Sequence, residues 1–126
     1  YWEDTDAGGV VFYANYLKFF ERARTEWLRG HGFAQEQMRQ DQGVMFVVSA
    51  TSLRYLHPAR LDDLLQVTVE PRELGRASML LFQQARRADG VLLAEGEIRI
   101  GCVGSNSFKP TRIPASILEA LSPLDL

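Results

Sequence analysis

The sequence has little cysteine and little histidine, and both shortages exclude classes of site. Cys102 is the only cysteine, so one chain can form neither an internal disulfide nor a thiolate metal cluster. It alternates with Ile98 and Ile100, which predicts a small buried residue. The two histidines, His31 and His57, lack the spacing of a metal-binding motif. We therefore expect no bound metal and no cofactor, and the single thiol fits a reducing compartment such as the cytoplasm.

Long apolar runs and an excess of basic charge are also missing. No stretch of apolar residues is long enough to cross a bilayer as a helix. The chain carries a formal net charge of -2 and has a pI of about 5.7. This argues against nucleic acid as a partner, because a phosphate backbone needs a basic surface. A local arginine cluster remains compatible with one small polyphosphate ligand.

What the sequence does contain is the composition of a globular domain. Hydrophobic residues make up 46% of its 126 residues and charged residues 24%, which argues against disorder. Repeats, low-complexity tracts and linkers are absent from the sequence, so we predict a single domain over residues 1–126. Residues 1–3 have the character of a strand end, and we expect this first strand to begin before Tyr1.

The spacing of apolar residues predicts one long helix over residues 15–31. Tyr16, Phe20 and Trp27 belong to an apolar stripe that recurs every three or four positions, and we expect them in the core. Glu21 is expected to form an ion pair with Arg24 or another arginine. Strand-forming and turn residues predict the other elements: a short helix over 34–42, strands over 44–55, 65–70, 77–87 and 91–103, and a terminal helix over 115–121.

This order of elements predicts an α+β fold with an antiparallel sheet. Counting the strand at the start of the chain, the sheet has five strands. One apolar helix and one sheet can bury each other, so we expect the sheet to wrap around the long helix. Residues 44–55 carry little charge, and an uncharged sheet edge needs a partner. We expect two copies to pair through this edge as a dimer.

Two carboxylates, Asp4 and Asp6, stand on a glycine-containing loop directly before the long helix. The unpaired N–H groups and positive dipole end of a helix N-terminus can polarise a carbonyl group. A carboxylate beside that carbonyl can attack it or deprotonate a water molecule. Gly8 and Gly9 permit a close approach to the backbone. On the residues alone, the alternative is that Asp4 and Asp6 only order the turn.

A family resemblance rests on residues 4–16 (DTDAGGVVFYANY), 20–24 (FERAR) and 58–63 (PARLDD), with Lys109-Pro110 near the end. These segments resemble the 4-hydroxybenzoyl-CoA thioesterase-like hotdog family, and most closely its Tol–Pal-associated (YbgC-type) acyl-CoA thioesterase branch. The resemblance covers nearly the whole chain in the same order. It implies the hotdog fold, with a five-stranded antiparallel sheet around one long central helix, and a homodimer or homotetramer.

The resemblance also implies roles for individual residues. Asp6 matches the catalytic carboxylate of the family, and Asp4 orders the loop. A backbone N–H at the start of the long helix, at Tyr13 or a neighbour, polarises the thioester carbonyl. The YbgC-type branch often has His at the position of Tyr13, whereas the aryl-CoA branch has Tyr, so the class of acyl group stays open. The substrate-binding residues implied within this motif are Gly8, Gly9 and Val11.

Coenzyme A carries phosphates, which need cations. Arg72 and Arg76 flank the turn at Gly75, and the family places basic residues on this hairpin, with Arg76 the better match. Lys109 is a third candidate. Further candidates are Arg60 and Arg112.

The sequence therefore predicts an acyl-CoA thioesterase that releases a fatty or aromatic acid and CoA, with Asp6 as nucleophile or general base. Acyl carrier protein is a second candidate partner. Two alternatives stay open. One is a hotdog hydratase or dehydratase, although that chemistry usually relies on a histidine and residues 4–16 contain none. The other is a non-catalytic scaffold that binds acyl thioesters or acyl carrier protein.

Overall fold

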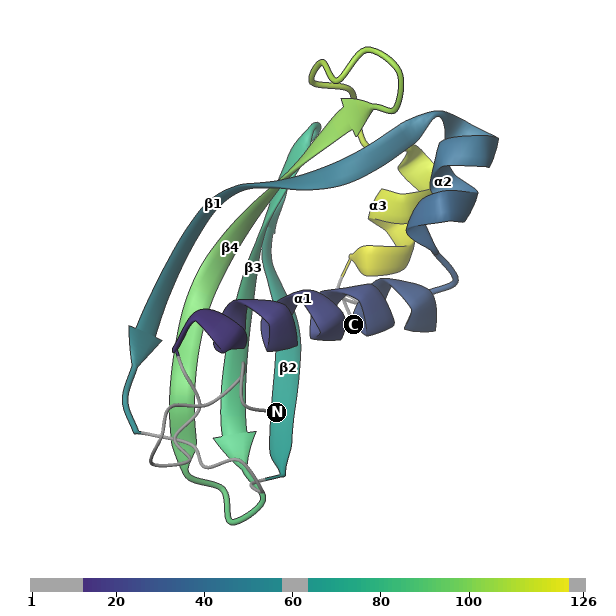
Figure 1. The fold of residues 1–126 in the computed structure, drawn as a ribbon. Helices are drawn as coiled ribbons and strands as arrows, with labels where there is room; N and C mark the ends of the chain where they lie inside the picture. The colour runs from purple at the N-terminus through teal and green to yellow at the C-terminus, as the bar shows by residue number, and fades with distance from the viewer. Residues whose placement is uncertain (1–12, 58–63, 123–126) are drawn as a thin grey trace.

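The computed structural model describes residues 13–57 and 64–122, with side-chain detail from Tyr16 onward. Figure 1 shows how the helices and strands of these residues are arranged. No helix in these ranges is long and apolar enough to cross a membrane. In chain order the elements are α1 (Tyr13–Gly30), α2 (Gln35–Gln42), β1 (Val44–Tyr55), β2 (Leu65–Leu74), β3 (Ser78–Arg87), β4 (Leu92–Gly104) and α3 (Ala115–Leu121).

The strands form one antiparallel sheet in the order β1-β4-β3-β2, which confirms the predicted α+β class with an antiparallel sheet. The sheet has four strands within the described ranges, where five were predicted. The fifth was assigned to the start of the chain, and residues 1–12 lie outside the described part. Among the described strands, β1 and β2 are therefore the two edges of the sheet.

Helix α1 lies against the concave face of the sheet, across its strands (Figure 1). Its apolar stripe is buried as predicted: Phe20 is fully buried, Tyr16 and Leu28 are nearly so, and Trp27 packs partly buried against the core. The inner faces of β3 and β4 supply the opposing side chains, which are Met79, Leu81, Ala85, Ala94, Ile98, Ile100 and Cys102. The core forms between helix and sheet because apolar side chains alternate along β3 and β4 and recur every three or four residues along α1.

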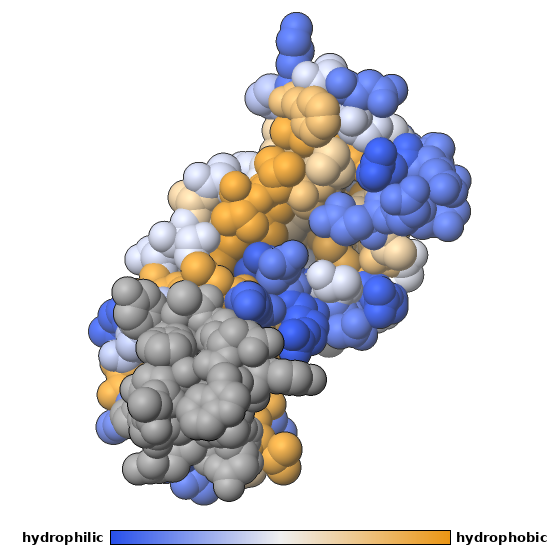
Figure 2. Space-filling model, viewed as in Figure 1, coloured by the Kyte–Doolittle hydropathy of each residue, from blue (hydrophilic) through white to orange (hydrophobic). Residues whose placement is uncertain are grey.

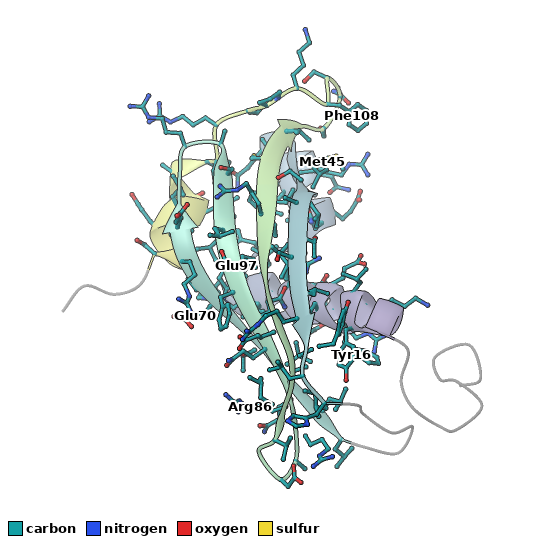
Figure 3. All side chains as sticks on the ribbon, turned by 90° about the vertical axis from the view of Figure 1, so that its left-hand side faces the viewer. Tyr16, Met45, Glu70, Arg86, Glu97 and Phe108 are labelled. Carbon is teal, nitrogen blue, oxygen red and sulfur yellow. The ribbon has the colours of Figure 1, made fainter. Side chains whose placement is uncertain are left out.

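The outer face of the sheet is polar. Figure 3 looks onto this face, with Glu70, Glu97 and Arg86 on it and α1 behind the sheet. Its ion pairs include Arg54–Glu95 at 2.5 Å, Arg99–Glu73 at 3.5 Å and Arg72–Glu70 at 3.6 Å. Only the inner face of the sheet therefore contributes to the described core.

Strand β1 forms an edge with one charged residue, Arg54. Its pairing with β4 shifts register between Val48 and Ala50, which marks a bulge, and Val48 is 50% exposed. Figure 2 shows an apolar band over this part of the molecule, beside the hydrophilic surface of α2. The predicted edge with little charge is present among the described strands, and pairing with a second copy stays a prediction.

Candidate functional site

The helix half of the predicted site is the start of α1 at Tyr13. The helix has 18 residues and no acidic side chain in its first turn, so no carboxylate within that turn offsets its positive dipole end. The loop half of the site lies outside the described residues. It comprises Asp4 and Asp6 with the expected substrate contacts Gly8, Gly9 and Val11.

Apolar side chains surround the described beginning of α1. The ring of Tyr16 lies 5.8 Å from the ring of Tyr55 and 6.0 Å from that of Phe19, measured between centroids. The first of these contacts places the helix start beside the end of β1. Leu17 and Tyr55 nevertheless leave 46% and 44% of their surface exposed. An apolar acyl group could bury this surface, whereas a polar ligand could not do so without a cost.

A buried polar side chain ties α1 to the sheet. Gln83, on the inner face of β3, has no exposed surface. Its Oε1 accepts a hydrogen bond from Arg24 Nη1 at 2.8 Å, and its Nε2 donates one to the main-chain oxygen of Phe20 at 3.0 Å. Burial lowers the pKa of the Arg24 guanidinium, and the nearby charge of Glu21 opposes that shift. The ion pair of Glu21 with Arg24 or another arginine stays a prediction.

Gln83 was not among the residues predicted from the sequence. The one available signal was its place in β3, where the alternation of Met79, Leu81 and Ala85 calls for another apolar residue.

Three of the five candidate phosphate-binding residues, Arg76, Lys109 and Arg112, lie at one end of the sheet. Arg76 is in the turn between β2 and β3, and its main-chain oxygen accepts a hydrogen bond from Ile113 N at 2.6 Å. Lys109 follows β4, and its main-chain oxygen accepts one from Gly104 N at 3.0 Å. The side chains of Arg76, Lys109 and Arg112 are all exposed.

These cations and the start of α1 lie at opposite ends of the sheet. Tyr55, which contacts the first turn of α1, pairs with Ala94, whereas the cations adjoin the other end of β4 at Gly104. The ten residue-to-residue steps from Ala94 to Gly104 span about 33 Å of strand. Within one chain, the fold therefore does not bring Arg76 or Lys109 beside the helix start.

Arg72 lies near the end of β2, before the turn at Gly75 that it was predicted to flank. Its guanidinium carbon lies 4.3 Å from the centre of the Phe82 ring. That stacking and the ion pair with Glu70 hold it on the outer face of the sheet. Its role in binding phosphate stays a prediction. Arg60 lies outside the described residues.

The described residues offer no metal site and no reactive thiol. No group of three His, Cys, Asp or Glu side chains in residues 13–57 and 64–122 could hold a metal ion. Cys102 is buried as predicted, and burial raises the pKa of its thiol. A thiol in this state is a poor nucleophile.

Residues 1–121 match the family model described as the thioesterase-like superfamily. The acyl-CoA thioester hydrolase YbgC of Escherichia coli O6:H1 is 43% identical over 118 residues, which are 94% of this chain and 87% of that protein. The acyl-CoA thioesterase YbgC of Haemophilus influenzae is 40% identical over 124 residues, or 98% and 90% of the two chains. The crystal structure of a hypothetical protein from Thermus thermophilus superposes with a TM-score of 0.87 at 33% identity, covering 97% of this chain and 92% of that one.

Proposed function

Because this chain belongs to the thioesterase-like superfamily of hotdog proteins, we propose that this thioester hydrolase cleaves a fatty or aromatic acyl-CoA to the free acid and CoA. The observation that carries the proposal is the position of α1. The helix begins at Tyr13, seven residues after Asp6, with an acid-free first turn beside exposed apolar surface. The identity of 43% and 40% to the two YbgC proteins supports acyl-CoA as the substrate class.

In the proposed mechanism, the thioester carbonyl accepts a hydrogen bond from a main-chain amide at the start of α1, at Tyr13 or a neighbour. Negative charge that develops on this oxygen is stabilised by the unpaired amides and the helix dipole. Asp6 then either attacks the carbonyl carbon, giving a mixed anhydride, or removes a proton from an attacking water. The thiolate of CoA departs without a strong general acid in either route. In the first route, water then hydrolyses the anhydride, which releases the free acid and restores the Asp6 carboxylate.

A thiol-release assay with Asp6→Ala tests the proposal. The wild type should release thiol from at least one member of a panel of short-chain, long-chain and aromatic acyl-CoAs, and Asp6→Ala should lose nearly all of this turnover. Asp41→Ala is a matched control, because it removes an exposed carboxylate from α2, and it should keep wild-type activity. Wild-type turnover in Asp6→Ala would refute the role of Asp6. Binding of acyl-CoA without thiol release by the wild type would favour the scaffold alternative instead.

We further propose that the phosphates of CoA reach Arg76 and Lys109 of a second copy of the chain. The separation between the helix start and these cations supports this arrangement, as does the nearly uncharged β1 edge. A homodimer or homotetramer paired through β1 would supply the second copy.

Charge reversal tests the nucleotide contact. Arg76→Glu should raise KM for an acyl-CoA more than KM for the same acyl group on a short thioester that lacks the nucleotide. Arg39→Glu, at an exposed arginine of α2, should change neither value by as much. Equal effects of Arg76→Glu on both substrates would count against a contact between Arg76 and the nucleotide.

A further inference from the structure

Gln83 is a polar residue in a position that packing alone would fill with an apolar one. Its neighbours on the inner face of β3, Leu81 and Ala85, are fully buried, and so is Gln83 itself. Burial of an amide is costly unless its donor and acceptor are both bonded, and here both are. An apolar side chain of similar volume would make no such demand and is often equally stable. The Gln83 amide therefore has a role beyond filling space in the core.

The two hydrogen bonds of Gln83 define where α1 sits. Its Nε2 donates to the main-chain oxygen of Phe20, which is part of the helix backbone and cannot move independently of it. Apolar contacts tolerate small sliding and rotation of a helix, whereas a hydrogen bond to a main-chain atom limits both through its length and angle. Arg24, one turn further along α1, holds the other end of the same amide. One side chain of β3 thus joins the helix at two successive turns.

We propose that Gln83 is a positioning residue for thioester hydrolysis, holding α1 so that the amides at its start meet the thioester carbonyl. This inference rests on the proposed function. Phe20 is seven residues from Tyr13, about 10 Å along the helix axis. A short helix moves almost as a rigid rod, so loss of the anchor at Phe20 displaces its first turn as well. A misplacement of about 1 Å can cost up to roughly 100-fold in rate.

The test compares Gln83→Met with Gln84→Met in steady-state kinetics. Gln83→Met keeps the side-chain volume and removes both hydrogen bonds to α1. Gln84→Met removes a hydrogen bond of the neighbouring residue to Glu95 on the outer face of the sheet, away from α1. On the best acyl-CoA of the wild type, Gln83→Met should lower kcat about tenfold and change KM less than about twofold. Gln84→Met should change both by less than about twofold.

Amide hydrogen exchange supplies a second measurement that does not depend on turnover. Gln83→Met should speed exchange in α1 around Phe20 and Arg24, and Gln84→Met should not. Wild-type kcat in Gln83→Met, an equal loss in Gln84→Met, or a rise in KM without a fall in kcat would each overturn the proposal. Unchanged exchange in α1 would overturn it as well. Absence of thiol release by the wild type would instead refute the proposed function itself.

A second variant covers the case in which Gln83→Met does not fold. Arg24→Met acts at a position that is only partly buried and removes the guanidinium that orients the Gln83 amide. It should lower kcat about threefold and speed exchange in α1 in the same direction. Wild-type kcat and wild-type exchange in folded Arg24→Met would also overturn the proposal.

Discussion

Gly96 in β4 is the residue at which the smallest substitution should have a large effect. It pairs with Leu53 of β1 on one side and with Gln83 of β3 on the other. A Cβ added at Gly96 would overlap the side chain of Leu53 and the main-chain oxygen of Ser52. The main-chain oxygen belongs to a paired strand, so it cannot move aside without disturbing the β1–β4 ladder.

The expected loss for Gly96→Ala follows from two opposing terms. Overlap in a packed interior costs about 1–3 kcal/mol. Replacement of glycine by alanine lowers the conformational entropy of the unfolded chain, which stabilises the folded state by about 0.4–1 kcal/mol. With the middle of each range, about 2 and about 0.7 kcal/mol, the net loss in the free energy of unfolding should be about 1–2 kcal/mol. For 126 residues the unfolding entropy is roughly 265 cal/mol/K, so Tm should fall by about 4–8 °C.

Thermal unfolding followed by circular dichroism, with Gly101→Ala as the control, measures this effect. Gly101 lies in the same strand, but a Cβ added there meets nothing within 4 Å. Gly101→Ala should leave Tm unchanged or raise it slightly. A Gly96→Ala protein with the Tm of the wild type, or an equal fall of Tm in Gly101→Ala, would refute a steric cause at Gly96.

Three further predictions concern titration, backbone strain and thiol access. Hydrogen bonds from Arg54 and then Gln84 hold the pKa of Glu95 below its usual value. The stabilisation this provides is present above the unfolded-state pKa of about 4.3 and is lost as pH falls through the folded-state pKa. Between about pH 6 and pH 3 the urea midpoint of Glu95→Gln should therefore fall less than that of the wild type, and parallel curves would contradict this. Phe108 has a φ of 57°, a left-handed conformation that is strained for residues other than glycine, and its ring is 68% exposed. Phe108→Gly should therefore raise the free energy of unfolding in urea by about 0.5–1 kcal/mol. A decrease would show that the ring is needed for stability. Cys102 is buried with a raised pKa, so iodoacetamide should label it only as fast as the chain unfolds, and rapid labelling of the native protein would show that the thiol is accessible.

Most elements of the fold could be predicted because their periodicity is strong. The helix predicted over residues 15–31 is found at Tyr13–Gly30, and the strand predicted over residues 44–55 has those bounds. The strand predicted over residues 65–70 instead continues to Leu74. The regular alternation stops at Glu70, but the strand continues through Pro71 because β2 is an edge strand of the described sheet, where a missing N–H is tolerated, and a bulge follows the proline.

The site was less predictable, because its contacts join residues that are distant in the sequence. Gln83 and Arg24 are 59 residues apart, and no local pattern indicates their hydrogen bond. The separation of Arg76 and Lys109 from the helix start likewise appears only once β4 is paired with its neighbours. The roles of Asp6, Gly8 and the rest of the loop remain predictions that rest on the motif, since these residues lie outside the described ranges.

The register shift between Val48 and Ala50 also bears on self-association. It divides β1 into two halves whose main-chain hydrogen-bonding groups differ in register. A regular strand that pairs in register with one half therefore cannot form regular hydrogen bonds with the other half. A regular strand of an unrelated chain could form main-chain hydrogen bonds along only about half of this edge. A strand with a bulge at the matching position could form them along the whole edge. An edge of this kind discourages open-ended fibre growth while remaining available to a specific neighbour.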